Sequence, residues 1–200
     1  MPAPRDALSF VNAAIPEPFQ ILGLRLKPFT LGHYITLKRF GCAFVSDEKT
    51  EAEKGDLLLG CLVCSMNNRE FLEFLEAEDH EAKVVEWGEK CGAFNFAEKC
   101  QLFADYLAAS FHEPSFSVIG DQQGDTSGDW SQNLKLAMML KLNASEEAVL
   151  NTPLSSLMSD YFRLAEMDGL IRIESEGDAA AADANAKILE AALKGELCPD

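Results

Sequence analysis

Apolar side chains recur at intervals of three and four residues through most of this 200-residue chain. That spacing brings side chains onto one face of an α-helix, whereas a half-buried strand needs alternation. Segment 96–111 is an example, with an apolar stripe formed by Phe96, Cys100, Phe103, Leu107 and Phe111. The pattern predicts a mainly α protein, a helical bundle, with a minor β element at residues 19–27, near the N-terminus.

Capping residues divide this pattern into separate helices. An N-cap side chain accepts a hydrogen bond from a free backbone N–H, and glycine ends a helix by adopting positive φ. We predict helix ends at Gly92 and Gly169 and a short extended piece at 170–173. The helix that enters the run 57–66 is apolar on every side and is predicted to lie buried at the centre. The predicted N-caps are Thr30, Thr50, Asn95 and Thr152.

A polar segment separates two helical parts of the chain. Residues 119–129, IGDQQGDTSGD, concentrate Gly, Asp, Ser and Gln, a composition typical of a linker. We therefore predict an N-terminal helical domain with the short β element over 1–118 and a linker over 119–129. Residues 130–200 are predicted to form a C-terminal helical segment that packs on the first domain. Further helices are predicted over 4–14 and 178–195.

Acidic residues outnumber basic ones, 33 against 17, giving a net charge of −16. Such a chain repels phosphate backbones, so no nucleic-acid partner is expected. The first 45 residues carry five bases and two acids, a local +3, against −19 for the remainder. This asymmetry favours either head-to-tail packing of subunits into a homo-oligomer or a plain scatter of solvated charges.

The chain shows no targeting or membrane-spanning pattern. The N-terminus, MPAPRDALSF, lacks the apolar segment of a secretory signal. The longest apolar run, LLLGCLVCSM, is roughly half of the ~20 residues that a membrane span needs. We therefore expect a cytoplasmic protein with no membrane partner, whose six cysteines are thiols.

Cys61 and Cys64 are the first candidates for chemistry. Two thiols three residues apart on a helix lie side by side and could bind Zn²⁺ or exchange disulfides. A zinc site needs two more ligands, and neither the other cysteines nor the scattered histidines supply them at a recognisable spacing. Leucine and valine flank the pair, so we predict core cysteines, no metal and no cofactor, with a metal or redox site as the alternative.

The other candidate sites lack residues that their chemistry requires. His112 and Glu113 could act as a general base and its orienting carboxylate, but no nucleophile lies in a suitable motif. Asp121, Asp125 and Asp129 suggest a calcium loop, but the glycine and the bidentate glutamate of that loop are missing. Nucleotide-binding glycine motifs are also missing. We therefore predict no catalytic residues and no enzymatic activity.

The segment after the linker is richer in apolar residues than a peripheral helix needs. Methionine-rich helices adapt to the surface of a partner helix. We predict a partner-binding surface there, with a simple core helix as the alternative. The predicted partner-binding residues are Trp130, Leu134, Met138 and Met139.

The order of these features resembles tail assembly chaperones of long-tailed phages and prophages. The similarity lies in a short extended N-terminal segment, a Thr-Leu-Gly-His helix start at 30–33 and a Trp-led helix from Trp130. It continues with Ser-Glu-Glu at 145–147 and a Thr-Pro-Leu helix that ends in Ala-Glu-Met-Asp-Gly at 165–169.

The resemblance implies a small, largely helical, non-enzymatic protein of the bacterial host cytoplasm. Members of that family bind the long helical tape-measure protein, keep it soluble and help the tail tube to polymerise around it. No functional residue is transferred from the family to this chain. Two other functions stay open: a cysteine-based metal-binding or redox-sensing regulator, and a structural tail or adaptor protein that remains in the finished particle.

Overall fold

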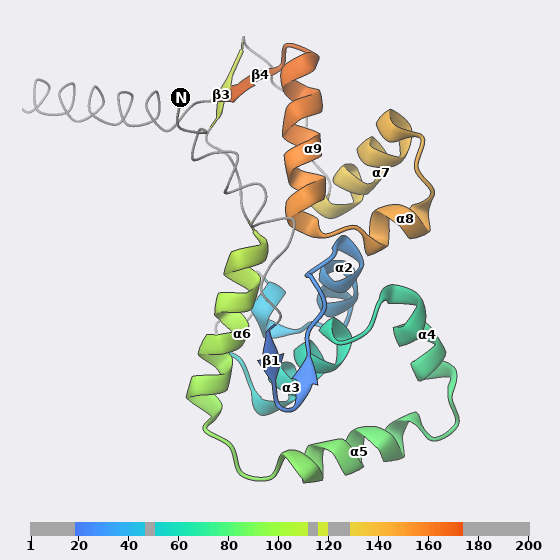
Figure 1. Cartoon of the computed structure of the whole chain (residues 1–200), viewed down its shortest axis with the longest axis vertical. Coiled ribbons are helices and arrows are strands. Elements are labelled where there is room, and N and C mark those ends of the chain that lie inside the picture. Colours follow the sequence, from blue (N-terminus) through green and yellow to red (C-terminus); the bar gives the residue numbers. More distant parts are fainter. Residues whose placement is uncertain (1–18, 47–50, 112–115, 120–128, 174–200) are drawn as a thin grey trace, which may run out of the picture.

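The computed structural model describes residues 19–46, 51–111, 116–119 and 129–173, and these are mainly helical, as predicted (Figure 1). The helices predicted over 4–14 and 178–195 lie outside the described residues. The described helices are α2 (Leu31–Arg39), α3 (Lys54–Cys64), α4 (Asn68–Glu76), α5 (His80–Cys91), α6 (Phe96–Ser110), α7 (Trp130–Leu142), α8 (Glu146–Asn151) and α9 (Leu154–Met167), together with the 3-10 turn η1 (Ala43–Val45).

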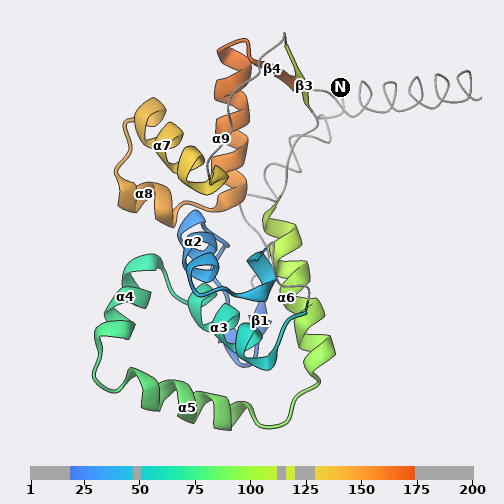
Figure 2. The same cartoon turned by 180° about the vertical axis from the view of Figure 1, so that it is seen from behind.

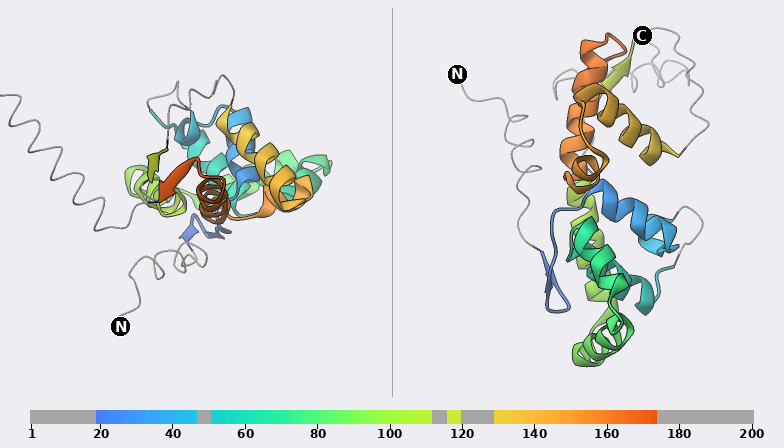
Figure 3. Two further views of the ribbon diagram at one scale, coloured as in Figure 1. Left: turned by 90° about the horizontal axis from the view of Figure 1, so that it is seen from above. Right: turned by 90° about the vertical axis from the view of Figure 1, so that its right-hand side faces the viewer.

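The predicted β element near the N-terminus is a hairpin. Strands β1 (Gln20–Ile21) and β2 (Leu24–Arg25) pair antiparallel. Leu22 and Gly23 form the turn, with φ of +51° and +79°. Two successive positive φ values match the right-handed twist of a hairpin. Figure 3 shows this hairpin at the edge of the bundle, next to α6.

A second small sheet joins distant parts of the chain. Strand β3 (Phe116–Val118) pairs antiparallel with β4 (Ile171–Ile173), which confirms the extended piece predicted at 170–173. The sequence analysis missed β3, because its three residues are all exposed and show no inside-outside alternation.

Helix α3 is buried at the centre, as predicted. Leu57, Cys61 and Cys64 on this helix are fully buried. Gly60 brings α3 close to α6, because a Cβ at this position would lie 2.6 Å from the Phe103 ring. One apolar core surrounds α3 and extends as far as α9.

Several helix boundaries follow the predicted caps. The side chains of Thr30 and Asn95 accept hydrogen bonds from backbone N–H groups at the starts of α2 and α6. Gly92 and Gly169 follow the ends of α5 and α9 with positive φ. These four boundaries are confirmed because the local chemistry of a single residue decides them.

Two predicted caps are wrong. Helix α3 begins at Lys54 with Glu53 as its N-cap, not at Thr50, because Asp56 accepts hydrogen bonds from the N–H groups of both Glu53 (2.9 Å) and Ala43 (3.0 Å). Thr152 is the C-cap of α8, and its hydroxyl donates to the Ala148 carbonyl. In both cases hydrogen bonds other than the predicted capping bond accompany the observed boundary.

Elements on the two sides of the predicted 119–129 linker are in contact. Helix α8 packs on α2, so that α2 lies between the α7–α9 group and α3 (Figures 1 and 2). The Leu154 N–H donates to the Phe29 carbonyl (2.8 Å), and Thr30 and Pro153 form an isolated β-bridge. Residues 120–128, most of that linker, lie outside the described residues.

Helix α5 is peripheral, and none of its residues is buried. A Cβ on Gly88, in the middle of α5, would meet no atom within 4 Å. We expect Gly88→Ala to raise the free energy of unfolding by about 0.5–1 kcal/mol, because alanine loses less backbone entropy in a helix. Urea denaturation measures this change.

Gly92→Ala at the end of the same helix is the matched control. Its Cβ also points into open space, but the residue has φ of +59° and ψ of −148°. This conformation suits only glycine, so we expect a loss of about 1 kcal/mol or more. Shifts of the same sign in the two variants would contradict the backbone argument.

Candidate functional site

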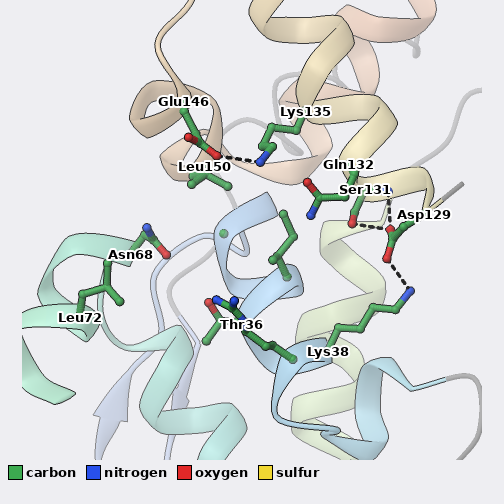
Figure 4. Close-up of a pocket in the computed structure, with 13 residues that line it drawn as sticks. Thr36, Lys38, Asn68, Leu72, Asp129, Ser131, Gln132, Lys135, Glu146 and Leu150 are labelled. Atoms are coloured by element: carbon green, nitrogen blue, oxygen red, sulfur yellow. Dashed lines mark hydrogen bonds and ion pairs between the residues drawn. The ribbon is translucent and has the colours of Figure 1, made fainter.

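A groove lies where α2, α4, α7 and α8 meet (Figure 4). Its volume is about 520 Å³, within the range of pockets that bind ligands or side chains of a partner. The residues that line it are Gly32, Ile35, Thr36, Lys38, Arg39, Asn68, Leu72, Asp129, Ser131, Gln132, Lys135, Glu146 and Leu150.

A close backbone approach forms the floor of this groove. A Cβ on Gly32 of α2 would lie 2.7 Å from the Leu150 carbonyl oxygen of α8, so only glycine allows this contact. The Asn68 N–H at the start of α4 donates to the Asn151 side chain at the end of α8 (3.1 Å). The two contacts hold three of the four helices in place.

Two ion pairs connect the helices that form the walls of the groove. The Lys38 ammonium lies 3.1 Å from Asp129, and Lys135 lies 2.7 Å from Glu146. Asp129 also caps α7, and its hydrogen bonds, first with the Ser131 hydroxyl, lower the pKa of its carboxyl. The hydrogen bond to Asp129 raises the pKa of Lys38. Lys38 and Asp129 therefore each favour the charged form of the other, an arrangement that suits recognition better than proton transfer.

The remaining surface of the groove is amphipathic. Ile35 and Leu150 are half-buried, while the Leu72 side chain is 52% exposed on the rim. Arg39 is exposed, and within the described ranges it has no carboxylate partner. Apolar groups beside charges are the surface that an amphipathic helix needs from a partner.

His33 connects α2 to the chain just after α3. Its Nδ1 accepts a hydrogen bond from the Thr30 N–H (3.2 Å), and its Nε2 bonds the Met66 carbonyl (2.7 Å), which requires the neutral Nε2–H tautomer. Burial lowers the pKa of His33 to about 4. The sequence analysis missed this role, although Thr30-x-x-His33 has the spacing of a capping box.

Of the four predicted partner-binding residues, two are buried in the core and two are at least partly exposed. Leu134 and Met138 are buried, so their assignment to a partner surface is wrong and the alternative of a core helix holds for them. Met139 is half-buried against the core. Trp130 is 39% exposed and donates its indole N–H to the Tyr34 hydroxyl (3.1 Å). None of the four lines the groove.

Two more exposed apolar residues of α7, Leu136 and Leu140, lie on the face away from Leu134. Leu136 is 53% exposed and Leu140 82% exposed. The sequence could not distinguish the two faces, because α7 is apolar on nearly every side and the buried face is decided by contacts with α2, α8 and α9.

Cys61 and Cys64 lie in the core, in agreement with the predicted core cysteines. Burial raises the pKa of the Cys61 thiol to about 12 and also raises that of Cys64. Among the residues that the structure describes, no three His, Cys, Asp or Glu side chains come together as a metal site. A buried neutral thiol is neither a good nucleophile nor a ready metal ligand.

We expect Cys61 and Cys64 to react with iodoacetamide only after unfolding, because both are buried as neutral thiols. Cys91 and Cys100 are half-buried and serve as internal controls that react in the native protein. Mass spectrometry of peptides labelled with and without urea measures the difference. Fast native labelling of the Cys61 and Cys64 pair would restore the redox alternative.

Of the other candidate residues, the structure describes His80 and Asp129, and both have local roles at helix starts. His80 bonds the Ala77 carbonyl (2.7 Å) at the start of α5. Asp129 serves as the α7 cap, whereas His112, Glu113, Asp121 and Asp125 lie outside the described residues.

The described residues therefore form a mainly helical fold with a groove between four helices. No described helix combines the length and apolarity required to cross a lipid bilayer. Neither a protein-family model, nor a curated protein, nor a solved structure matches the chain.

Proposed function

We propose that this protein is a non-enzymatic tail assembly chaperone of a phage or prophage, and that it binds helical segments of the tape-measure protein during tail morphogenesis. The groove between α2, α4, α7 and α8 is the proposed binding surface. It acts in the host cytoplasm, where the client must stay soluble until the tail tube grows around it.

The amphipathic groove is the observation that carries this proposal. Leu72, Ile35 and Leu150 offer an apolar strip, and the charges of Lys38 and Lys135 are already held by Asp129 and Glu146. A client helix can therefore bury apolar side chains beside Lys38 and Lys135 without leaving either of these two charges unpaired.

The sequence supports the same function independently of the groove. The order of the 30–33, 145–147 and 165–169 segments resembles tail assembly chaperones. A net charge of −16 makes copies of the protein repel one another, which opposes their aggregation.

Co-expression with a phage tape-measure protein tests this function. We expect the tagged wild type to capture the client and keep it soluble. Leu72→Glu is expected to weaken capture about tenfold or more, because it places a charge on the apolar rim of the groove. Failure of the wild type to capture any tape-measure segment would overturn the proposed function.

Val85→Glu is the matched control for the groove. Val85 is 60% exposed on α5 and does not line the groove, so we expect normal capture. Leu140→Glu tests the outer face of α7 in the same way. Loss of capture in Leu140→Glu with normal capture in Leu72→Glu would move the binding surface from the groove to that face.

A further inference from the structure

A second cavity lies between the β1–β2 hairpin tip, the end of α5 and the start of α6. Its volume is about 650 Å³, and it is separate from the groove described above. Its lining combines aromatic and aliphatic side chains with two lysines. The lining residues are Gln20, Leu22, Gly23, Leu24, Trp87, Lys90, Cys91, Phe94 and Lys99.

Side chains of α5 hold the hairpin side of the cavity in place by hydrogen bonds to Leu22. Leu22 has φ of +51°, a left-handed conformation that ordinary side chains rarely adopt. Its carbonyl accepts the Trp87 indole N–H (3.3 Å) and lies 3.8 Å from the Cys91 sulfur, which also donates to it. The hairpin tip and the Trp87 ring are therefore held in one arrangement, and the cavity is formed before any ligand arrives.

The charged side chains that line this cavity are both lysines. Lys90 and Lys99 line it, and a third ammonium group, on Lys54, lies 5.1 Å from the centre of the Phe94 ring. No carboxylate belongs to the lining, although acids outnumber bases 33 to 17 in the whole chain. Glu86 and Glu98 pair with Lys90 and Lys99 from outside the cavity.

We propose that this cavity binds a small organic anion that carries its carboxylate or sulfonate on an aromatic ring system. The rings of Trp87 and Phe94 and the Leu24 side chain would cover the aromatic part. Lys90 and Lys99 would bind the anionic group by charge-assisted hydrogen bonds. This proposal does not depend on the proposed function, because it uses different residues on another side of the protein.

The probe that tests the site is 8-anilinonaphthalene-1-sulfonate, and its uncharged counterpart is N-phenyl-1-naphthylamine. We expect the sulfonate to bind the full-length native protein at one saturable site, and the uncharged dye to bind at least about fivefold more weakly. The fluorescence increase on titration measures both affinities.

Two double variants with equal charge change localise the probe. Lys90→Gln with Lys99→Gln is expected to weaken sulfonate binding about fivefold, from the loss of two partly exposed charge contacts. Arg69→Gln with Lys83→Gln removes two cations that form i,i+4 ion pairs away from the cavity, and we expect unchanged binding.

Three results would overturn the proposal. They are no saturable binding of the sulfonate, equal affinity for the charged and uncharged dyes, and equal weakening in the two double variants. Circular dichroism of each variant checks that the helices are intact. Normal tape-measure capture by the Lys90 and Lys99 double variant would show that this site and the proposed chaperone groove act separately.

Discussion

Gly32→Ala is expected to lower the free energy of unfolding by about 2–3 kcal/mol, a large loss for one added methyl group. The new Cβ would lie 2.7 Å from the Leu150 carbonyl oxygen, which belongs to the backbone of α8 and cannot rotate away. Helices α2 and α8 must therefore separate, and core overpacking of this kind costs about 1–3 kcal/mol. The floor of the groove widens as a result, so client capture should weaken as well.

Gly55→Ala is the matched control for this experiment. Gly55 is also the second residue of its helix, α3, but its Cβ would meet no atom within 4 Å. Alanine there should leave stability unchanged or raise it by up to about 1 kcal/mol, because alanine favours the helix. Urea denaturation of both variants gives the comparison. Equal stability changes in Gly32→Ala and Gly55→Ala would show that α2 and α8 do not touch as described.

The contrast between these two glycines also shows what the sequence could and could not predict. Both lie near a helix start, and nothing in the neighbouring residues distinguishes them. Only the fold reveals that one of them faces another backbone. Helix ends at Gly92 and Gly169 were predictable, because positive φ at the end of a helix is a local requirement.

The candidate groove could not be predicted, because four helices from distant parts of the chain build it. The apolar excess of α7 was visible in the sequence, but its assignment to a partner surface was wrong for Leu134 and Met138. Periodicity identifies an apolar helix without revealing which face meets the core. Nothing in the sequence around Leu72 marks it as the rim of a groove.

Acid should destabilise the wild type through His33 well before its carboxylates are neutralised. The His33 ring is almost fully buried, and its Nδ1 must stay unprotonated to accept the Thr30 N–H. Desolvation lowers the pKa of the ring from 6.5 to about 4, so the unfolded chain binds a proton that the folded protein rejects. The contribution of neutral His33 to the stability of the fold is therefore complete above about pH 6.5. It is lost as the pH falls toward 4. A shift of this size corresponds to about 3 kcal/mol in total, of which about 2 kcal/mol disappears between pH 7 and pH 5.

His33→Gln removes the titrating ring while keeping a side chain that can accept the Thr30 N–H, as in a capping box. We expect this variant to be less stable than the wild type at pH 7 and to lose most of the pH dependence between pH 7 and pH 5. His80→Gln, at the start of α5, is the control and should keep the slope of the wild type. Urea denaturation at a series of pH values measures all three proteins. An unchanged dependence of stability on pH in His33→Gln would show that another group carries the acid sensitivity. Burial would then not be what keeps His33 neutral.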